Sequence, residues 1–508
     1  MRITMLLELH AHTNRHSKCS LIDPVTLVKK AIAKGLQGLV ITEHHYQWSD
    51  EELAKLKIEA GAVKAFILLS GQEVSTDAGH VLVYGADTSI PEKTNLKDLR
   101  KLYPRAALVL AHPYRKKSSV AEETLTTPLL DAVEIFSLNH TPKENYAGLK
   151  SWHELKFTAI SGSDTHSEEK AGALPSQFDH EVKNIRDLVT EIKNGRVRPF
   201  FKEIPKSGSD LTVTEITLGT KGDDEVRQRI IIKTLRTEKR WEKTRTSALL
   251  MQKIHGGGFD SGRYRVPRVI ELNETEKTVI EEGQRGKNLF ELLCGVSPSA
   301  GLTYFELSAR WMSRFHGLKF KPGLTTGFIE REERKLAAYE NTFTTTNNPR
   351  LKQAKLLLDF VRAEESALTA KHSASFILNH GDFHPKNIII GQDRMHDPET
   401  VFVSVIDFAN ALETLPAFDV GYYLAQFKSQ FAAYPEILKR YTDELFIKTY
   451  FGTAKPPKSF RNEVDLFIIR ANLSIANYFM KVGKGESREL YSLVAGSTAL
   501  MKKLKSRR

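Results

Sequence analysis

Three residues near the C-terminal end could carry out phosphoryl transfer. The chain reads HGDFHPKNIII over residues 380–390 and VIDF over residues 405–408. Transfer from ATP needs one carboxylate to orient the attacking hydroxyl, and an amide and a second carboxylate to hold magnesium ions. Asp382, Asn387 and Asp407 supply these groups in this order. The motif predicts a kinase-type active site that uses ATP and Mg²⁺.

The first 200 residues are rich in side chains that bind metal ions. Eleven of the seventeen histidines precede residue 210. Strand alternation places His10 and His12 of the His-Ala-His segment on the same side of a strand, and it does the same for Asp164 and His166 of the Asp-Thr-His segment. Imidazole and carboxylate groups suit Zn²⁺, Mn²⁺ or Fe²⁺. The candidate ligands are His10, His12, His44, Glu73, His80, His112, Asp164 and His166.

Eight ligands exceed what one ion needs, so a cluster of two or three ions is expected. Clustered ions lower the pKa of a bridging water and clamp a phosphate, which is the chemistry of phosphoester hydrolysis. A histidine taken singly is ordinarily structural or solvated, and we interpret His140, His153 and His180 in that way. Arg115, Lys116 and Lys117 closely follow His112, and they are either a grip for a substrate phosphate or a solvated run of charge.

Short apolar strands alternate with helical stretches up to about residue 200, which favours a βα-barrel-like domain. Polar residues after the strands would then meet at one mouth of the barrel. The expected strands are Thr4–Leu9, Gly38–Thr42, Phe66–Gln72, His80–Tyr84, Ala107–Ala111, Ala132–Phe136 and Phe157–Ser161. The expected helices include Pro24–Lys34, Leu96–Leu102 and Asn184–Asn194.

The pattern changes near residue 200. Strands are expected at Leu211–Leu218, Val226–Leu235 and Thr278–Glu282, with a helix from about Glu238 to Ile254 that three glycines close. Beyond Leu289 the sequence is mostly helical. We therefore predict two domains, residues 1–200 and 201–508, the second with a small lobe at about 201–285 and a large helical lobe at about 286–508.

Composition is that of an ordinary globular chain. Its 508 residues are too many for one core, and 41% are hydrophobic and 27% charged. No apolar run is long enough for a transmembrane helix, so no membrane partner is expected. Cys19 and Cys294 are far apart, which favours a reducing cytoplasm. The net charge of +12 favours anionic partners such as nucleotides, sugar phosphates or nucleic acid.

The N-terminal motifs resemble the polymerase and histidinol phosphatase (PHP) family of metal-dependent phosphoesterases. The matching pieces are His10-Ala11-His12-Thr13, Ile41-Thr42-Glu43-His44, Gly71-Gln72-Glu73-Val74, Gly79-His80-Val81-Leu82, Ala111-His112-Pro113 and Gly162-Ser163-Asp164-Thr165-His166. The resemblance implies a distorted seven-stranded βα barrel with up to three metals, in which Glu73 bridges and His16 is the ninth ligand. The family usually has aspartate where this chain has Glu43, a longer arm that could orient its neighbours differently.

The C-terminal motifs resemble the aminoglycoside phosphotransferase and choline kinase family, whose fold is that of protein kinases. The resemblance covers about residues 198–508 and implies that Asp382 is the catalytic base, that Asn387 and Asp407 bind magnesium, and that Asp419 is structural. The small lobe would add ATP-binding groups. These are Lys233 on the phosphates, the turn Gly208-Ser209 over them, and Glu242 as the helix partner of Lys233, with Glu238 as its rival.

Three functions fit these patterns. The first is a bifunctional enzyme that hydrolyses a phosphate ester of a small molecule at the N-terminal site and phosphorylates a small-molecule hydroxyl at the C-terminal site. The second is a nucleic-acid end-processing kinase and phosphatase, although no basic stretch is interleaved with aromatic residues. The third is a phosphoesterase that a nucleotide-binding, kinase-like module regulates. The sequence does not indicate an oligomeric state.

Overall fold

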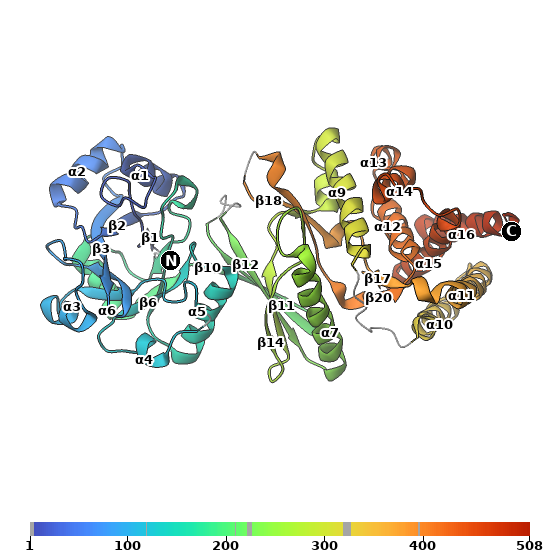
Figure 1. Ribbon diagram of the computed structural model, residues 1–508, viewed down its shortest axis with the longest axis horizontal. Helices are drawn as coiled ribbons and strands as arrows, with labels where there is room; N and C mark the ends of the chain where they lie inside the picture. Colours follow the sequence, from blue (N-terminus) through green and yellow to red (C-terminus); the bar gives the residue numbers. More distant parts are fainter. Residues whose placement is uncertain are drawn as a thin grey trace. The chain divides into compact units, whose positions relative to one another are not determined.

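The computed structural model describes residues 5–117, 119–208, 210–220, 226–318, 327–394 and 397–507. The chain divides into two compact units (Figure 1). The first extends to Leu235 and also contains Asn273–Arg285, and the second contains Arg236–Leu272 and Gly286–Arg508. The strands between residue 200 and Leu235 therefore group with the N-terminal unit.

A nine-stranded mixed sheet forms the centre of the first unit, in the order β7-β6-β5-β4-β3-β2-β1-β8-β9. Its parallel pairs are β1–β2, β2–β3, β5–β6 and β6–β7, and the other pairs are antiparallel. The strands are β1 (Met5–Glu8), β2 (Gly38–His44), β3 (Ile67–Thr76), β4 (Gly79–Tyr84), β5 (Ala107–Leu110), β6 (Ala132–Ser137), β7 (Ala159–Gly162), β8 (Ser176–Phe178) and β9 (Val197–Pro199).

The two ends of this sheet approach each other. The backbone N–H of Ser161 in β7 donates to Oγ of Ser176 in β8, 2.9 Å away, and β7 also lies beside β9. The sheet is thus nearly closed, and buried side chains such as Leu7, Leu82 and Val109 pack together in one core. It has two strands more than the expected seven-stranded barrel, so the PHP-type barrel stays a prediction.

Helices lie on the outside of the curled sheet (Figure 1). They are α1 (Pro24–Ala33), α2 (Asp50–Glu59), α3 (Leu96–Leu102), α4 (Glu122–Leu125), α5 (Pro142–Leu155) and α6 (Ile185–Lys193). Their starts follow from local chemistry. At α5, for example, Thr141 and Glu144 form a reciprocal capping box and proline occupies the first turn, where its missing N–H costs nothing.

A second, smaller sheet follows in the first unit. Four of its five strands belong to the first unit. They are β10 (Phe201–Ser207), β11 (Leu211–Leu218), β12 (Gln228–Leu235) and β15 (Thr278–Gly283), paired antiparallel in that order. Gln228 of β12 connects this second sheet to helix α5 and to the residue His140 that precedes it. Its amide accepts from Asn145 of α5 at 2.8 Å and donates to the carbonyl of His140 at 2.7 Å.

The second unit is mainly helical. Its helices are α7 (Glu238–Ile254), α8 (Leu289–Leu293), α9 (Pro298–His316), α10 (Phe328–Thr345), α11 (Leu351–His372), α12 (Ala417–Gln430), α13 (Pro435–Arg440), α14 (Asp443–Phe451), α15 (Phe460–Lys481) and α16 (Arg488–Ser506). The strand β14 (Val269–Asn273) leads the chain back to the first unit. Among the residues described, no helix has both the length and the hydropathy that crossing a bilayer requires.

Two small sheets support the loops of the second unit. One has the order β13-β19-β18-β16, and the other pairs β17 with β20. Their bounds are β13 (Tyr264–Arg265), β16 (Lys287–Asn288), β17 (Ile377–Asn379), β18 (Ile388–Gln392), β19 (Val401–Val405) and β20 (Leu412–Thr414). Buried aromatic residues pack behind these loops, with the ring of Trp311 stacked on Phe315 and on Phe383.

Candidate functional site

Eight metal-binding side chains gather at one edge of the nine-stranded sheet. The predicted ligands His10, His12, His44, Glu73, His80, His112, Asp164 and His166 form four overlapping groups of three, whose donor atoms lie within 4.8 Å of one another. They come from the ends of β1, β2, β5 and β7 and from the antiparallel pair β3–β4. The structure thus brings together all eight of these residues, and the ninth predicted ligand, His16, is not in the four groups.

Glu73 lies at the centre of this cluster and is 1% exposed. Its Oε1 is 2.8 Å from Nδ1 of His80 and 2.9 Å from Nε2 of His112. Its Oε2 is 3.1 Å from Nδ1 of His44 and 3.2 Å from Nε2 of His12. Burial opposes ionisation of Glu73, but His10 and the other imidazoles outweigh burial and hold its pKa well below the usual range. A charged carboxylate with both oxygens shared in this way suits a bridging ligand.

Two buried carboxylates that the sequence analysis missed fix the orientation of the ligands. Oε1 of Glu134 accepts from Nδ1 of His10 at 3.0 Å, and its Oε2 accepts from the backbone N–H of His112 at 2.8 Å. Glu8 accepts the backbone N–H groups of His10 at 3.1 Å and of Ser163 at 2.9 Å. Carboxylates behind histidine ligands usually set the ring orientation. The signal in the sequence is a single glutamate within each apolar strand, MLLE and AVEIFS.

The glycine next to this network is required by space. A side chain at Gly162 would collide with the carboxylate of Glu134 and with the side chain of His10. Gly162 therefore lets β7 approach the ligands closely enough for Asp164, two residues later, to join them. Oδ1 of Asp164 lies 3.5 Å from Nε2 of both His10 and His12.

His16 does not join the cluster. Its ring stacks on Tyr46 with 3.8 Å between the centroids, and its Nε2 lies 3.5 Å from Glu52. His16 is not in the four groups of ligands, because its side chain packs towards α2, and its role as the ninth ligand stays a prediction. Glu43, the departure from the family pattern, is buried and accepts from the backbone N–H of Thr13 at 3.1 Å and from the indole N–H of Trp48 at 3.3 Å.

A pocket of about 300 Å³ opens beside the cluster. Two of the ligands, His80 and His112, line it together with Arg115, Lys116 and Lys117. The three cations predicted as a phosphate grip or a solvated run thus share a wall with the candidate metal ligands. Positive charge at this place would attract an anionic substrate.

In the second unit, a buried aspartate shapes the loop that carries Asp382. Asp419 of α12 is fully buried and accepts the backbone N–H groups of His380 at 2.6 Å and of Gly381 at 2.9 Å. Nε2 of His316, at the end of α9, lies 3.2 Å from Oδ2 of Asp419. Gly381 has φ +76, and a Cβ there would collide with the carbonyl of Asn410. The loop can therefore take this course only with glycine at position 381.

Asp382 is held by side chains on both of its oxygens. The Tyr422 hydroxyl donates to Oδ1 at 2.6 Å, and Nδ2 of Asn410 lies 3.4 Å from Oδ2. The amide of Asn387 donates to the backbone carbonyl of Asp382 at 3.0 Å. Tyr422 is a further residue that the sequence analysis missed, since it lies forty positions after its partner and belongs to no motif.

The two predicted magnesium ligands lie at one edge of the antiparallel pair β18–β19. Asn387 precedes β18 and Asp407 follows β19 closely, and Ile388 of β18 pairs with Val405 of β19. The N–H of Ile406 also donates to the carbonyl of Asn387 at 3.0 Å. Asp407 has φ +68, and its Oδ1 accepts from the N–H of Ala409 at 3.3 Å.

Lys233, the predicted phosphate-binding lysine, forms an ion pair with a glutamate that the sequence analysis did not select. Nζ of Lys233 lies 2.8 Å from both carboxylate oxygens of Glu281, on the neighbouring strand β15. Ile231 is opposite Glu281 in the register, so Lys233 and Glu281 are diagonal neighbours on one face. Lys233 therefore pairs with a strand glutamate. Glu242 lies on α7 and lines a pocket of the second unit, and its role as the helix partner of Lys233 stays a prediction. A contact of Lys233 with ATP phosphates stays a prediction.

The predicted phosphate-covering turn is described only in part. The N–H of Gly208 donates to the carbonyl of Leu211 at 2.8 Å, which closes the hairpin between β10 and β11. Ser209 lies outside the described residues. The role of both residues in covering a phosphate remains a prediction.

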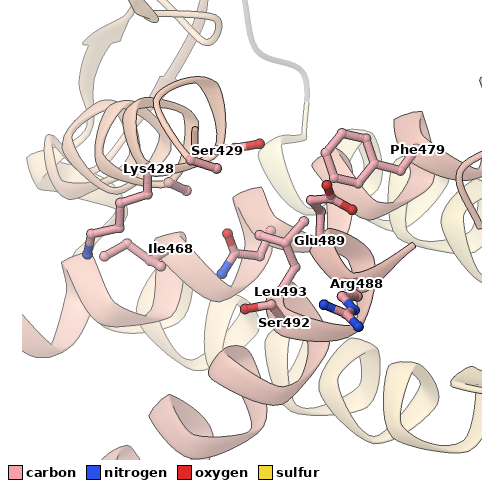
Figure 2. Close-up of a pocket in the computed structure, with 11 residues that line it drawn as sticks. Lys428, Ser429, Ile468, Phe479, Arg488, Glu489, Ser492 and Leu493 are labelled. Carbon is pink, nitrogen blue, oxygen red and sulfur yellow. The ribbon is translucent and has the colours of Figure 1, made fainter. Parts of the chain in front are cut away.

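Another pocket of the second unit, of about 440 Å³, lies among α12, α15 and α16 (Figure 2). Its wall is largely apolar, with Ile468, Phe479 and Leu493. Lys428, at its edge, is paired with Asp443 at 2.7 Å.

Comparisons with known proteins single out the C-terminal part. Residues 242–452 match the Phosphotransferase enzyme family. An ethanolamine kinase of Plasmodium vivax aligns at 15% identity and a TM-score of 0.38, covering 63% of this chain and 85% of its own. A choline kinase of Cryptosporidium parvum aligns at 12% identity and a TM-score of 0.43, covering 61% and 90%.

Sequence comparison also finds an uncharacterized protein of Methanocaldococcus jannaschii. It is 25% identical over 147 residues, which are 27% of this chain and 84% of that protein. The family match contains Asp382, Asn387, Asp407 and Asp419, the four residues on which the loop geometry depends. The C-terminal part of the chain is therefore a phosphotransferase-like domain, with mixed α/β content.

Proposed function

We propose that the C-terminal part transfers the γ-phosphoryl group of ATP to a hydroxyl of a small molecule. The observation that carries this proposal is the anchored loop, in which Asp419 fixes the backbone and Tyr422 orients the carboxylate of Asp382. Asp382 would accept the proton of the attacking hydroxyl. Asn387 and Asp407 would hold magnesium, because amide and carboxylate oxygens are ligands that this ion prefers. Magnesium-bound ATP supplies the phosphoryl group, and the ion neutralises the charge that develops on it.

The test is Asp382→Asn, which keeps the shape of the side chain and removes its basicity. ATP-dependent phosphorylation, screened over a panel of hydroxyl compounds, should fall by about 10²- to 10⁴-fold. Asp359→Asn is the matched control, since Asp359 is 71% exposed and pairs only with Arg362 among the contacts of the described chain. Equal turnover by the Asp382 variant and the wild type would refute the assignment.

We further propose that the N-terminal cluster holds two or three divalent metal ions and hydrolyses a phosphoester. The donor set fits such ions, since three of its four groups combine imidazole and carboxylate atoms, the fourth consists of three imidazoles, and two of the groups share the charged Glu73. Bound ions would lower the pKa of a water and polarise the phosphate. Glu134 and Glu8 hold the ligands in place, and Arg115, Lys116 and Lys117 would attract the anionic ester into the adjacent pocket.

Metal analysis of the purified protein and phosphate release from a panel of monoesters and diesters test this proposal. We expect at least two ions per chain and a hydrolysis rate that chelation abolishes and Zn²⁺, Mn²⁺ or Fe²⁺ restores. Absence of bound metal after reconstitution would refute it. If ATP alters hydrolysis by the Asp382→Asn variant, the kinase-like part acts as a regulatory module, which is the alternative function.

A further inference from the structure

A pocket of about 450 Å³ in the second unit is lined by α7, by α10 and by the residues that follow Asp407. Four of its lining residues are basic and one is acidic. The basic residues are Lys243, Arg331, Arg334 and Lys335, and the acidic one is Glu242.

The positive charges in this pocket are crowded. Nζ of Lys243 lies 3.1 Å from the amide oxygen of Asn410, and the guanidinium of Arg331 donates to the carbonyls of Asn410 at 2.7 Å and Ala411 at 2.9 Å. Burial and the neighbouring charge of Arg331 lower the pKa of Lys243. Burial also lowers the pKa of Arg331, which the charge of Glu332 opposes and the charges of Arg470 and Arg334 reinforce. Holding like charges together out of water costs free energy that a bound anion would offset.

The pocket in Figure 2 provides a contrast within the same unit. There the ammonium group of Lys428 is neutralised by Asp443 at 2.7 Å, and Ile468 and Leu493 make the wall apolar. In the α7–α10 pocket, by comparison, Lys335 pairs with Glu332 at 3.1 Å, but Lys243 and Arg331 donate to uncharged oxygens. An anion is therefore better accommodated in the α7–α10 pocket.

The α7–α10 pocket also adjoins the catalytic loop. Asn410 forms part of its wall, and Nδ2 of the same side chain lies 3.4 Å from Oδ2 of Asp382. The charges of Asp407 and Asp382 both act on Lys243. A molecule seated in the pocket is thus one side chain away from the carboxylate that would activate a hydroxyl.

We propose that this pocket binds an acidic group, a phosphate or a carboxylate, of the acceptor molecule, so that the acceptor is an anionic hydroxy compound. The inference rests on the proposed phosphotransfer function of Asp382. In the reaction, the acceptor oxygen forms a bond to the γ-phosphorus as the bond from that phosphorus to the β–γ bridging oxygen breaks. The hydroxyl proton passes to Asp382, and ADP leaves. Cationic acceptors of the choline or ethanolamine type would be repelled by Lys243 and Arg331, which donate to uncharged oxygens.

The first experiment measures anion binding directly, without ATP. Inorganic phosphate is titrated calorimetrically into the full-length wild type, into Arg334→Glu and into the control Lys352→Glu. Arg334 lines the pocket and is exposed, whereas Lys352 is an exposed residue of α11 that does not line it, and both changes alter the net charge equally. We expect Arg334→Glu to remove or weaken by about tenfold one phosphate site that Lys352→Glu retains. Equal phosphate binding by all three proteins would overturn the proposal.

The second experiment compares acceptors under saturating Mg²⁺ and ATP. Glycerate and glycerol 3-phosphate are tested against glycerol and ethanolamine, each of which carries a hydroxyl. We expect acidic compounds to be preferred by at least about tenfold in kcat/KM, and Arg334→Glu to raise their KM by about tenfold while the KM for ATP is unchanged.

The remaining outcomes separate the possible failures. Equal use of neutral and acidic acceptors would overturn the proposal, and so would stimulation of glycerol turnover by phosphate, because the pocket would then hold an effector. If phosphate binding depends on Arg334 but neither the wild type nor Asp382→Asn consumes ATP with any hydroxyl compound, the proposed phosphotransfer function fails and the acceptor assignment fails with it, while the anion site itself stands.

Discussion

The two candidate sites hold their reactive groups by different means. In the N-terminal cluster the ligands come from strands distributed over residues 10–166, and they contact one another through Glu73. In the C-terminal site the three predicted groups lie within residues 382–407, and a backbone loop bound to Asp419 places them. The first site depends on the closure of a whole sheet, and the second depends on one buried anchor.

Buried carboxylates in the two regions also differ in charge. Imidazoles surround Glu73 and keep its pKa well below the usual range, although burial opposes this. Glu365 of α11 is 2% exposed, and burial together with the negative charge of Glu332 raises its pKa to about 8. Burial alone therefore does not determine the charge of a carboxylate, because the neighbouring groups also act on its pKa.

Removal of the shared carboxylate should have the largest effect. Glu73→Ala takes away a group close to four imidazoles, so bound metal should be lost and hydrolysis should fall by more than about a hundredfold, since even outer-sphere changes cost 10- to 100-fold. Metal content and phosphate release measure the result. Glu154→Ala, an exposed change on α5, should leave both unchanged. Full metal content in the Glu73 variant would contradict the central role of this residue.

Removal of the anchor carboxylate of Asp419 should have the next largest effect. Asp419→Ala leaves two buried N–H groups without their acceptor and should lower the free energy of unfolding by about 3 kcal/mol. Urea unfolding followed by circular dichroism measures this loss. Asp359→Ala, at an exposed ion pair, should cost less than about 1 kcal/mol. Similar losses for the two variants would mean that Asp419 does not anchor the loop.

A pH series would test the contrast between Glu73 and Glu365. The pKa of Glu365 rises on folding from 4.5 to about 8, so between these pH values the folded protein holds a proton that the unfolded chain has released. Stability therefore decreases as pH rises from 5 to 8. In Glu365→Gln this decrease should be smaller by at least about 1.4 kcal/mol, the equivalent of one pKa unit.

The unfolding free energy of each variant is measured in urea at several pH values. Glu436→Gln, an exposed change on α13, is the control and should keep the wild-type pH dependence. If Glu365→Gln keeps it as well, Glu365 is ionised in the folded protein and the contrast with Glu73 disappears.

The smallest expected effect concerns the orientation of Asp382. Tyr422→Phe removes the hydroxyl that donates to Oδ1 at 2.6 Å, and kcat for phosphotransfer should fall by about tenfold with the KM for the acceptor unchanged. Tyr478→Phe, at a residue that is 61% exposed, is the control. A rise in KM without a fall in kcat would show that Tyr422 contacts the acceptor and does not position Asp382.

Local patterns predicted the elements well. The helix from Glu238 to Ile254, the helix Leu96–Leu102 and the strand Leu211–Leu218 have the predicted bounds, because apolar periodicity and, at Leu96–Leu102, the capping residue Asn95 act over a few neighbouring positions. The predicted ligands apart from His16 also meet in one cluster. They could be found because each follows, or belongs to, an apolar strand, and strand ends converge when a sheet curls.

Contacts between distant side chains were not predictable in the same way. His16 lies only four residues after His12, yet its ring packs on Tyr46, and Lys233 pairs with Glu281 across a strand register that no local pattern specifies. The nine strands of the first sheet and the grouping of β10–β12 with the N-terminal unit likewise depend on long-range pairing.

The sequence by itself determined which chemistry each half can carry, since the types and order of residues such as Glu73, Asp382 and Asn387 limit the reactions available. Only the tertiary structure decided how these groups are held and charged. Glu134, Tyr422 and the basic residues of the α7–α10 pocket became visible once folding brought distant segments within hydrogen-bonding distance. The physical reason is that hydrogen bonds, burial and charge repulsion act over a few ångströms in space, whatever the separation along the chain.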